Sequence, residues 1–149
     1  MKDSHGMTPI VKTVTRVSVW LILLYGCYII LHGHLTPGGG FAGGVVIALA
    51  FLNVMLAYGK SFTAEWLNIR LLKDIEAASI TLFLVLGLLG IAFGNAFLAN
   101  FLGKGEMFSL FSSGTIPLFN IIIGIKVALS LFLVVWVLAD IDSAKGGDL

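Results

Sequence analysis

Residues 31–46, which read LHGHLTPGGGFAGGVV, separate two long apolar runs of the chain. Two histidines, a proline and a cluster of glycines fall within this short stretch, whereas the sequence on either side of it is strongly apolar. Over the whole chain of 149 residues, 58% are hydrophobic and 11% are charged. A soluble domain of this length needs more charge on its surface. The composition therefore predicts an integral membrane protein.

Outward from this stretch, four apolar runs are long enough to cross a hydrocarbon core of about 30 Å. The expected spans are residues 17–31, 38–58, 77–97 and 116–139. The first run is interpreted as a span because no small-x-small cleavage site follows it, as a signal peptide would require. No internal repeat is visible. We therefore predict an all-α fold, a single four-helix membrane domain over residues 1–149 that ends in a polar tail at 140–149.

The basic residues predict that both termini are cytoplasmic, because cytoplasmic loops carry an excess of lysine and arginine. In this topology the outer side has Lys104 alone, and Trp20, Trp66 and Trp136 lie at the cytoplasmic interface, which indoles favour. The cytoplasmic side collects Lys2, Lys12, Arg16, Lys60, Arg70, Lys73 and Lys145. Residues 57–77 are expected to form a short interfacial helix on that side. Residues 100–117 are expected to form an outer loop.

Several classes of function are excluded by composition. A net charge of +1 excludes an electrostatic nucleic-acid binder. The single cysteine, Cys27, lies in an apolar run, which predicts a buried, inert thiol without a disulfide or thiolate metal cluster. The chain lacks a nucleophile–base–orienter set, cysteine clusters and glycine-rich nucleotide loops. Neither an enzyme nor a bound cofactor is expected.

The glycine-rich stretch falls in the predicted outer hairpin, at the start of the second span. Thr36 is a candidate N-cap and Pro37 suits a first helical position, so Gly38, Gly39 and Gly40 are expected in the first helical turn. Two overlapping small-xxx-small pairs follow, and Phe41 is expected to project from their otherwise flat surface. The pairs are Gly39–Gly43 and Gly40–Gly44. This pattern favours tight helix packing together with a turn, and the alternative is direct contact with an ion.

His32 and His34 precede the glycines at the predicted outer face. Imidazole titrates near physiological pH, so histidines here could give protons or ions access to the membrane. The alternative is a pair of interfacial histidines that hydrogen-bond backbone carbonyls. Two ligands in an H-x-H arrangement without a nearby carboxylate make a weak metal site, so no metal is assigned.

Lys126 is the charged residue placed deepest in a predicted span. It lies roughly 15 Å into the last span by helical rise, where a lysine costs about 2.5–3.5 kcal/mol. Asp74, Glu76, Asp140 and Asp142 all lie toward the cytoplasmic ends, so no carboxylate of this chain is expected at its depth. Lys126 is then neutral, paired with another subunit, or snorkelling to the interface. Ser130 lies one turn away on the same face, and the two residues are candidates for a hydrated ion path.

The segments HGHLTPGGGFAGG (residues 32–44) and SSGTIPLFNIIIGIKV (residues 112–127) together resemble the MnhB-type family. This family comprises the MnhB subunits of the multisubunit Mrp sodium/proton antiporters and their counterparts in archaeal membrane-bound hydrogenases and sulfur reductases. The resemblance covers the whole four-span chain. The segments LHGHLTPGGGF and GTIPLFN are more similar to hydrogenase-associated members of the family. The motif is carried by His34, Pro37, Gly38, Gly39, Gly40, Phe41, Gly43 and Gly44.

The resemblance implies an accessory subunit of a prokaryotic plasma membrane, packed among other membrane subunits that exchange sodium ions for protons. We accordingly expect a non-catalytic subunit that helps to form or seal an ion path. A purely structural scaffold between transporting subunits is the alternative. The alternative with the least support is a stand-alone small transporter for an ion, or for a metal held by His32 and His34. Coupled transport usually needs more than the one isolated intramembrane charge that this chain offers.

Overall fold

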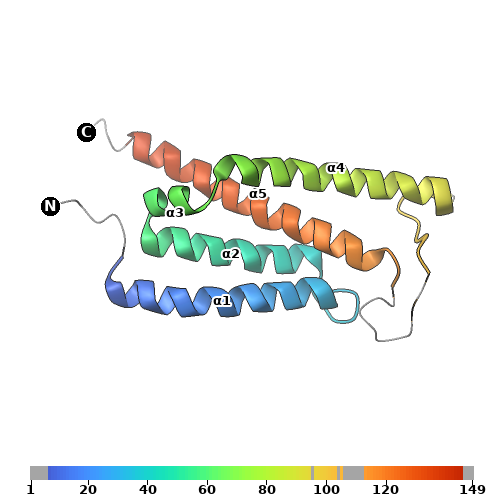
Figure 1. The fold of residues 1–149 in the computed structure, drawn as a ribbon, viewed down its shortest axis with the longest axis horizontal. Coiled ribbons are helices and arrows are strands. Elements are labelled where there is room, and N and C mark those ends of the chain that lie inside the picture. Colours follow the sequence, from blue (N-terminus) through green and yellow to red (C-terminus); the bar gives the residue numbers. More distant parts are fainter. Residues whose placement is uncertain (1–6, 95, 104, 106–112, 146–149) are drawn as a thin grey trace.

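The computed structural model describes residues 7–94, 96–103, 105 and 113–145. This part of the chain forms the helices α1 (Pro9–His32), α2 (Gly40–Tyr58), α3 (Lys60–Trp66), α4 (Ile69–Gly94) and α5 (Ile116–Lys145) (Figure 1). All of them except α3 are long and apolar enough to cross a membrane, with the α5 span running over Ile116–Ile141. The predicted all-helical fold with four candidate spans is confirmed.

The helices pack around α2 and α5. α2 lies between α1 and α5, and α4 packs on the far side of α5 (Figure 1). α3 lies at the end of the bundle where α1 begins and α5 ends, whereas the connection from α1 to α2 lies at the opposite end. We call these the α3 end and the hairpin end of the bundle.

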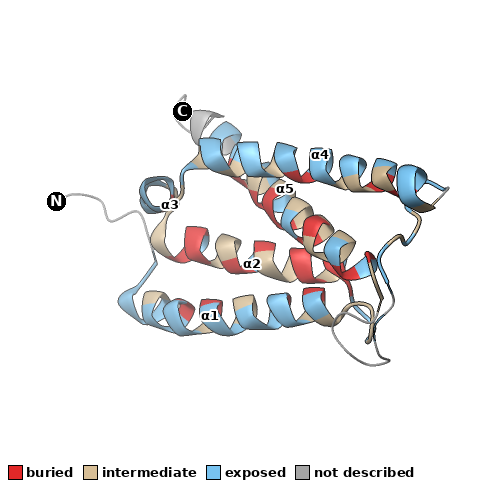
Figure 2. Ribbon diagram, turned by 45° about the vertical axis from the view of Figure 1, so that its right-hand side comes forward, coloured by how far each residue is buried: buried red, intermediate tan, exposed pale blue. Residues whose placement is uncertain are grey.

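Burial follows this order of packing. Buried residues concentrate on α2 and α5, whereas α1 and α4 expose most of their surface (Figure 2). The exposed side chains of α1 and α4 are mainly large and apolar, such as Leu24 on α1 and Leu84 on α4. A helix that is apolar on its exposed face as well as its buried one is typical of contact with lipid.

Two helices begin earlier than expected. α1 starts at Pro9 instead of residue 17, with proline at the favoured first position. α4 starts at Ile69 instead of residue 77. In both cases charged residues lie between the observed and the expected start; they interrupt the apolar run without ending the helix. The predicted helix within 57–77 is therefore split between α3 and the first turns of α4.

The second span begins later than expected, at Gly40. Thr36 does not cap it: its hydroxyl donates to the carbonyl oxygen of His32 (3.1 Å), so Thr36 closes the turn after α1. Gly39 takes the N-cap position at φ 108°, a left-handed conformation that favours glycine. Pro37 and Gly38 consequently precede the helix, and Gly40 is the one glycine of the triplet in its first turn.

The last helix is longer than expected. α5 continues through Lys145, so residues 140–145 of the predicted polar tail are helical. Residues 146–149 lie outside the described residues, as do Lys2, Lys104 and residues 106–112 of the predicted outer loop. The carboxylate of Asp140 pairs with the ammonium group of Lys60, which ties α3 to this extension of α5.

The prediction of a buried Cys27 is wrong, and the three tryptophans differ in their exposure. Cys27 is exposed, because α1 buries only one stripe and Cys27 lies beside that stripe, next to the buried Gly26. Trp136 is buried under Lys60, whose ammonium group lies 4.6 Å from the centre of the indole ring. Trp136 thus packs within the bundle, whereas Trp20 and Trp66 are exposed as interfacial indoles would be.

Candidate functional site

The glycines of residues 40–44 bring α2 into backbone contact with both of its neighbours. A Cβ atom added at Gly40 would lie 2.3 Å from the carbonyl oxygen of Asn120, and one at Gly44 would lie 2.7 Å from that of Gly124 on α5. On the opposite side, a Cβ atom at Gly43 would lie 2.8 Å from the carbonyl oxygen of Gly26 on α1. No side chain fits at these positions. The three glycines thus lie at close helix contacts within this chain.

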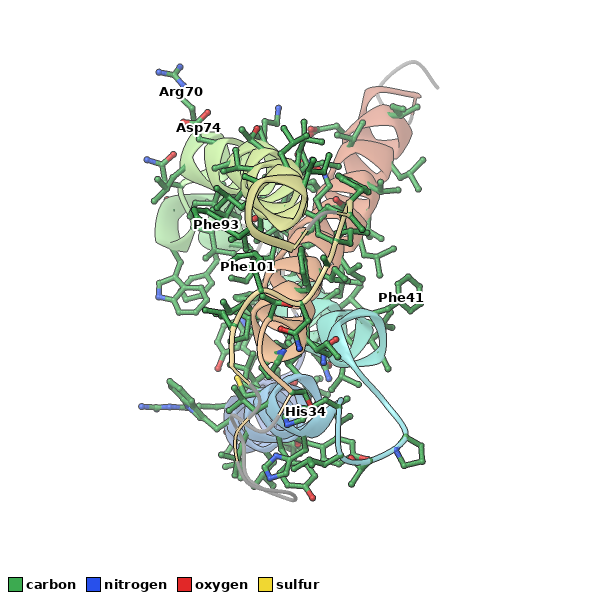
Figure 3. All side chains as sticks on the ribbon, turned by 90° about the vertical axis from the view of Figure 1, so that its right-hand side faces the viewer. His34, Phe41, Arg70, Asp74, Phe93 and Phe101 are labelled. Atoms are coloured by element: carbon green, nitrogen blue, oxygen red, sulfur yellow. The ribbon has the colours of Figure 1, made fainter. Side chains whose placement is uncertain are left out.

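Phe41 points away from these contacts. Its side chain is 67% exposed and projects outward from α2 (Figure 3). The backbone N–H of the preceding residue, Gly40, donates to Oδ1 of Asn120 (3.4 Å), so the first turn of α2 is fixed to α5. The described part of the chain places Phe41 where lipid or another subunit would cover it.

The two histidines are held differently. His32, the last residue of α1, stacks on Tyr28 with ring centroids 4.2 Å apart, and its Nδ1–H donates to the carbonyl oxygen of Tyr28 (3.2 Å). His34 is half-buried in the turn at the hairpin end (Figure 3). Among the described residues, no group of three or more His, Cys, Asp and Glu side chains could hold a metal ion. A role of these histidines in ion access stays a prediction.

Lys126 has a partner within the chain. Its ammonium group donates to Oε1 of Glu76 on α4, and the two side chains form an ion pair. The hydroxyl of Ser130 donates to the same carboxylate oxygen at 2.8 Å. We call Glu76, Lys126 and Ser130 the intramembrane cluster. Lys126 and Ser130 thus both contact Glu76 from one face of α5. The expectation that this chain offers Lys126 no carboxylate partner is wrong.

The sequence did not predict Glu76 as the partner of Lys126, because the expected start of the third span was too late. With a third span starting at residue 77, Glu76 falls in an interfacial linker. With α4 starting at Ile69, Glu76 lies about two turns into a helix that is long and apolar enough to cross a membrane. The side chain of Lys126 extends toward the α3 end and contacts Glu76 there.

The packed stripe of α4 explains why Glu76 faces α5. Every third or fourth residue of α4 is buried or half-buried against the bundle, in the heptad spacing of helices that pack along a seam. Glu76 is the charged member of this stripe, whereas Lys73 and Asp74 are exposed. The stripe consists of Ile69, Leu72, Glu76, Ser79, Phe83, Leu86 and Gly90.

Hollows lie on both sides of the intramembrane cluster along α5. Lys126 and Ser79 help to line one of about 190 Å³ toward the hairpin end. Glu76 and Ser130 help to line another of about 520 Å³ toward the α3 end. The remaining lining residues of both are apolar. The ion pair thus stands between two spaces at the α4–α5 seam.

Comparison with known proteins gives the family. A family model described as "Domain related to MnhB subunit of Na+/H+ antiporter" matches residues 10–133. The chain belongs to the MnhB family. The matched range contains both the glycine-rich stretch and the intramembrane cluster.

Two relatives illustrate how the family match extends along the chain. An uncharacterized protein of Methanocaldococcus jannaschii is 35% identical over 127 residues, which are 80% of this chain and 48% of that protein. A putative antiporter subunit mnhB2 of Staphylococcus aureus (strain Newman) is 35% identical over 96 residues, which are 62% of this chain and 64% of that protein. This MnhB-family chain spans about half of the first relative.

One solved structure is similar throughout the bundle. A chain in the structure of the membrane-bound sulfane sulfur reductase, an archaeal respiratory membrane complex, matches with a TM-score of 0.73 and 35% sequence identity. The match covers 91% of the MnhB-family chain and 59% of the reductase chain. The four-span arrangement is therefore shared with a subunit of a respiratory complex.

Proposed function

We propose that this MnhB-family chain is a non-catalytic subunit of a multisubunit sodium/proton antiporter module in a prokaryotic plasma membrane. The parent assembly is either a stand-alone Mrp-type antiporter or a redox-driven complex of the sulfur reductase or hydrogenase type. The family match and the mnhB2 relatives support the first assembly, and the structural match to the sulfane sulfur reductase supports the second. Both termini are cytoplasmic in this proposal, in accordance with the distribution of basic residues.

Within that module, the chain contributes the intramembrane cluster to an ion path. The observation that carries this assignment is the ion pair of Glu76 with Lys126 at the α4–α5 seam, because charged groups within spans mark ion pathways and proton relays in membrane proteins. In this proposal, water and ions reach the pair through the hollows on either side of it.

The chemistry of the cluster suits exchange. With Lys126 protonated and Glu76 ionised, the pair has no net charge. When Lys126 gives up a proton, the carboxylate is left uncompensated, and a sodium ion held by oxygens of Glu76 and Ser130 restores neutrality. One proton and one sodium ion can therefore replace each other at constant net charge, which avoids the cost of a bare charge inside the membrane.

The variant that tests this role is Lys126→Met, with Lys73→Met as the matched control on the exposed face of α4. Methionine keeps a long unbranched stem and removes the charge. The measurement is sodium-driven pH change in inverted vesicles, divided by the amount of assembled complex. We expect Lys126→Met to assemble and to lose exchange, and Lys73→Met to keep both.

Full exchange by an assembled Lys126→Met complex would overturn the ion-path role. The chain would then be a structural scaffold, an alternative that the close backbone contacts of α2 support. If Lys126→Met fails to assemble, the double variant with Glu76→Gln removes the unpaired carboxylate, and the same comparison is made with it. Mass spectrometry of the co-purifying subunits separates the two parent assemblies: iron–sulfur proteins indicate the redox-driven complex.

A further inference from the structure

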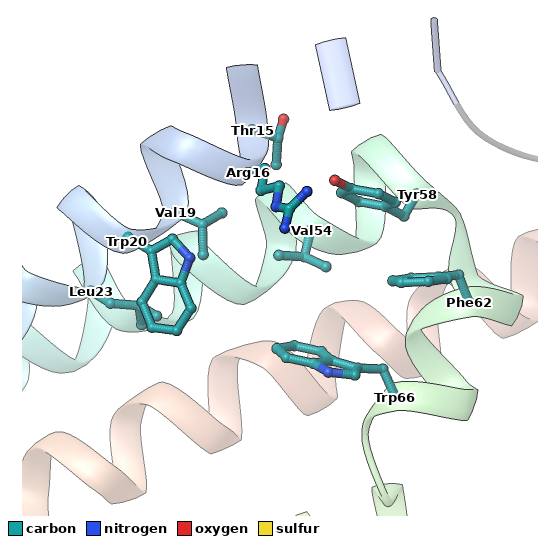
Figure 4. Close-up of a pocket in the computed structure, with 9 residues that line it drawn as sticks. All are labelled: Thr15, Arg16, Val19, Trp20, Leu23, Val54, Tyr58, Phe62 and Trp66. Carbon is teal, nitrogen blue, oxygen red and sulfur yellow. The ribbon is translucent and has the colours of Figure 1, made fainter. Parts of the chain in front are cut away.

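A groove between α1, α2 and α3 is separate from the intramembrane cluster. It encloses about 520 Å³ and is lined by Thr15, Arg16, Val19, Trp20, Leu23, Val54, Tyr58, Phe62 and Trp66 (Figure 4). This volume falls in the range of about 300–1,000 Å³ that is usual for small-molecule sites. Its lining is mainly apolar, and Arg16 is the one charged residue among the nine.

The groove changes in character along the membrane normal. Arg16 lies toward the α3 end, roughly 10 Å along α1 from Pro9, and Leu23 lies a further 10 Å or so toward the middle of the bundle. Tyr58 and Val54 repeat this order on the antiparallel helix α2. One end of the groove is therefore cationic and aromatic, and its deeper part is aliphatic.

The positive charge at the mouth is not neutralised by the lining. Arg16 is exposed and forms no ion pair with any residue that the structure describes, and none of the nine lining residues is acidic. The ammonium group of Lys12, one turn before Arg16, lies 5.9 Å from the centre of the Tyr58 ring, so a second cation stands at the same mouth. An anion placed here would meet two positive groups.

Two exposed indoles flank the groove. Trp20 on α1 and Trp66 on α3 are 71% and 60% exposed. Indoles favour the level of the lipid headgroups, where one edge of the ring meets polar groups and the face meets acyl chains. Their position places the mouth of the groove at that level and its aliphatic part within the acyl region.

From these observations we infer that the groove binds one anionic phospholipid. The headgroup phosphate lies against Arg16 and Lys12, and an acyl chain lies along Val19, Leu23 and Val54 between the aromatic side chains. Basic pockets between transmembrane helices hold anionic headgroups in this manner. Charge complementarity favours a lipid of this class, because a zwitterionic lipid would add its own cation beside Arg16 and Lys12.

The test uses a photoreactive side chain in the groove. p-Benzoylphenylalanine replaces Phe62, and the complex, purified with its subunits, is reconstituted in equal parts phosphatidylglycerol and phosphatidylcholine with identical acyl chains. After irradiation, denaturing mass spectrometry of this chain counts the lipid adducts. We expect phosphatidylglycerol adducts to exceed phosphatidylcholine adducts about fivefold. An excess of inorganic phosphate should not reduce them.

Three variants sharpen the result. Arg16→Gln should lower the preference for phosphatidylglycerol, because Lys12 alone remains at the mouth. Arg70→Gln, which changes an exposed basic residue of the first α4 turn outside the groove, should leave the preference unchanged. Leu23→Trp, which fills the aliphatic part with the cations in place, should lower the adducts of both lipids. Equal adducts of the two lipids in the parent chain, cross-links to another subunit in place of lipid, or an equal effect of Arg16→Gln and Arg70→Gln would overturn the proposal.

Discussion

The Glu76 carboxylate accepts hydrogen bonds from Lys126 and from Ser130 through a single oxygen, Oε1. Glu76 comes from α4, whereas both donors come from α5, one turn apart. The side chains of Glu76 and Lys126 are 25% and 29% exposed, so the pair is largely but not wholly covered by the two helices. The balance of charge across the α4–α5 seam depends on these two groups.

Removal of the carboxylate alone should destabilise the protein more than removal of both charges. In Glu76→Gln, the ammonium group of Lys126 stays in the membrane without its partner. Breaking a fully buried pair costs about 3–5 kcal/mol, and the partial exposure of this pair lowers the figure. The double variant Glu76→Gln/Lys126→Met should recover most of the loss. Thermal unfolding in detergent measures both.

The control for this pair of variants is Glu65→Gln, which removes an exposed carboxylate of α3. It should unfold at the temperature of the parent protein. Equal stability of Glu76→Gln and the parent would contradict a structural contribution of the ion pair.

Ser130→Ala should weaken the response to sodium without preventing assembly. The hydroxyl supplies one hydrogen bond to Glu76 in the ion-free state, and in our proposal one oxygen to the sodium ion. Loss of one such interaction corresponds to about a two- to tenfold rise in the sodium concentration at half-maximal exchange. The matched control is Thr81→Ala, which removes an exposed hydroxyl that donates within α4 to the carbonyl oxygen of Ala77. Identical sodium curves for Ser130→Ala and Thr81→Ala would remove Ser130 from the path.

Leucine at Gly40 or Gly43 should disrupt the bundle, whereas Phe41→Leu should not. A Cβ atom at either glycine meets a backbone carbonyl oxygen of a neighbouring helix within 3 Å, and backbone cannot move aside as a side chain can. Phe41 is exposed and keeps an apolar side chain in the variant. Native gels of membranes in mild detergent report the amount of assembled complex. Normal assembly of both glycine variants would contradict the close helix contacts.

Cysteine labelling should place the hairpin end of the bundle outside the cell and the α3 end inside. Because Cys27 is exposed, the background variant is Cys27→Ala. Thr36→Cys in the hairpin turn should react with an impermeant thiol reagent applied to whole cells. Arg70→Cys should react only after the membrane is opened. Labelling of Arg70→Cys in intact cells would reverse the topology that the basic residues predict.

The existence and approximate position of the four spans follow from composition alone, because a run of about twenty apolar residues has few alternatives. The residues at which the helices start cannot be predicted in this way, because charged residues such as Lys12 and Lys73 are compatible with a helix that extends beyond the membrane core. The boundary error at α4 concealed the partner of Lys126. With α4 starting at Ile69, Glu76 falls on the same helix face as Leu72 and Ser79.

Which helices are neighbours could not be predicted from the sequence. The glycines of α2 indicate close approach, but the same pattern serves contact with α1, with α5 or with another subunit. The structure assigns Gly43 to α1, and Gly40 and Gly44 to α5. The exposure of Cys27 was missed for a related reason: in a membrane protein, an apolar position is as compatible with lipid as with the interior.

The arrangement of helix contacts divides the bundle mechanically. α1, α2 and α5 are joined through backbone-to-backbone contacts at glycines, which leave little room for sliding, whereas α4 rests on α5 through side chains along one seam. A force that tilts or shifts α4 would stretch the Glu76–Lys126 contact before it disturbed the other three helices. The ion pair is therefore located where motion of a neighbouring subunit, transmitted through α4, would change the local charge balance most directly.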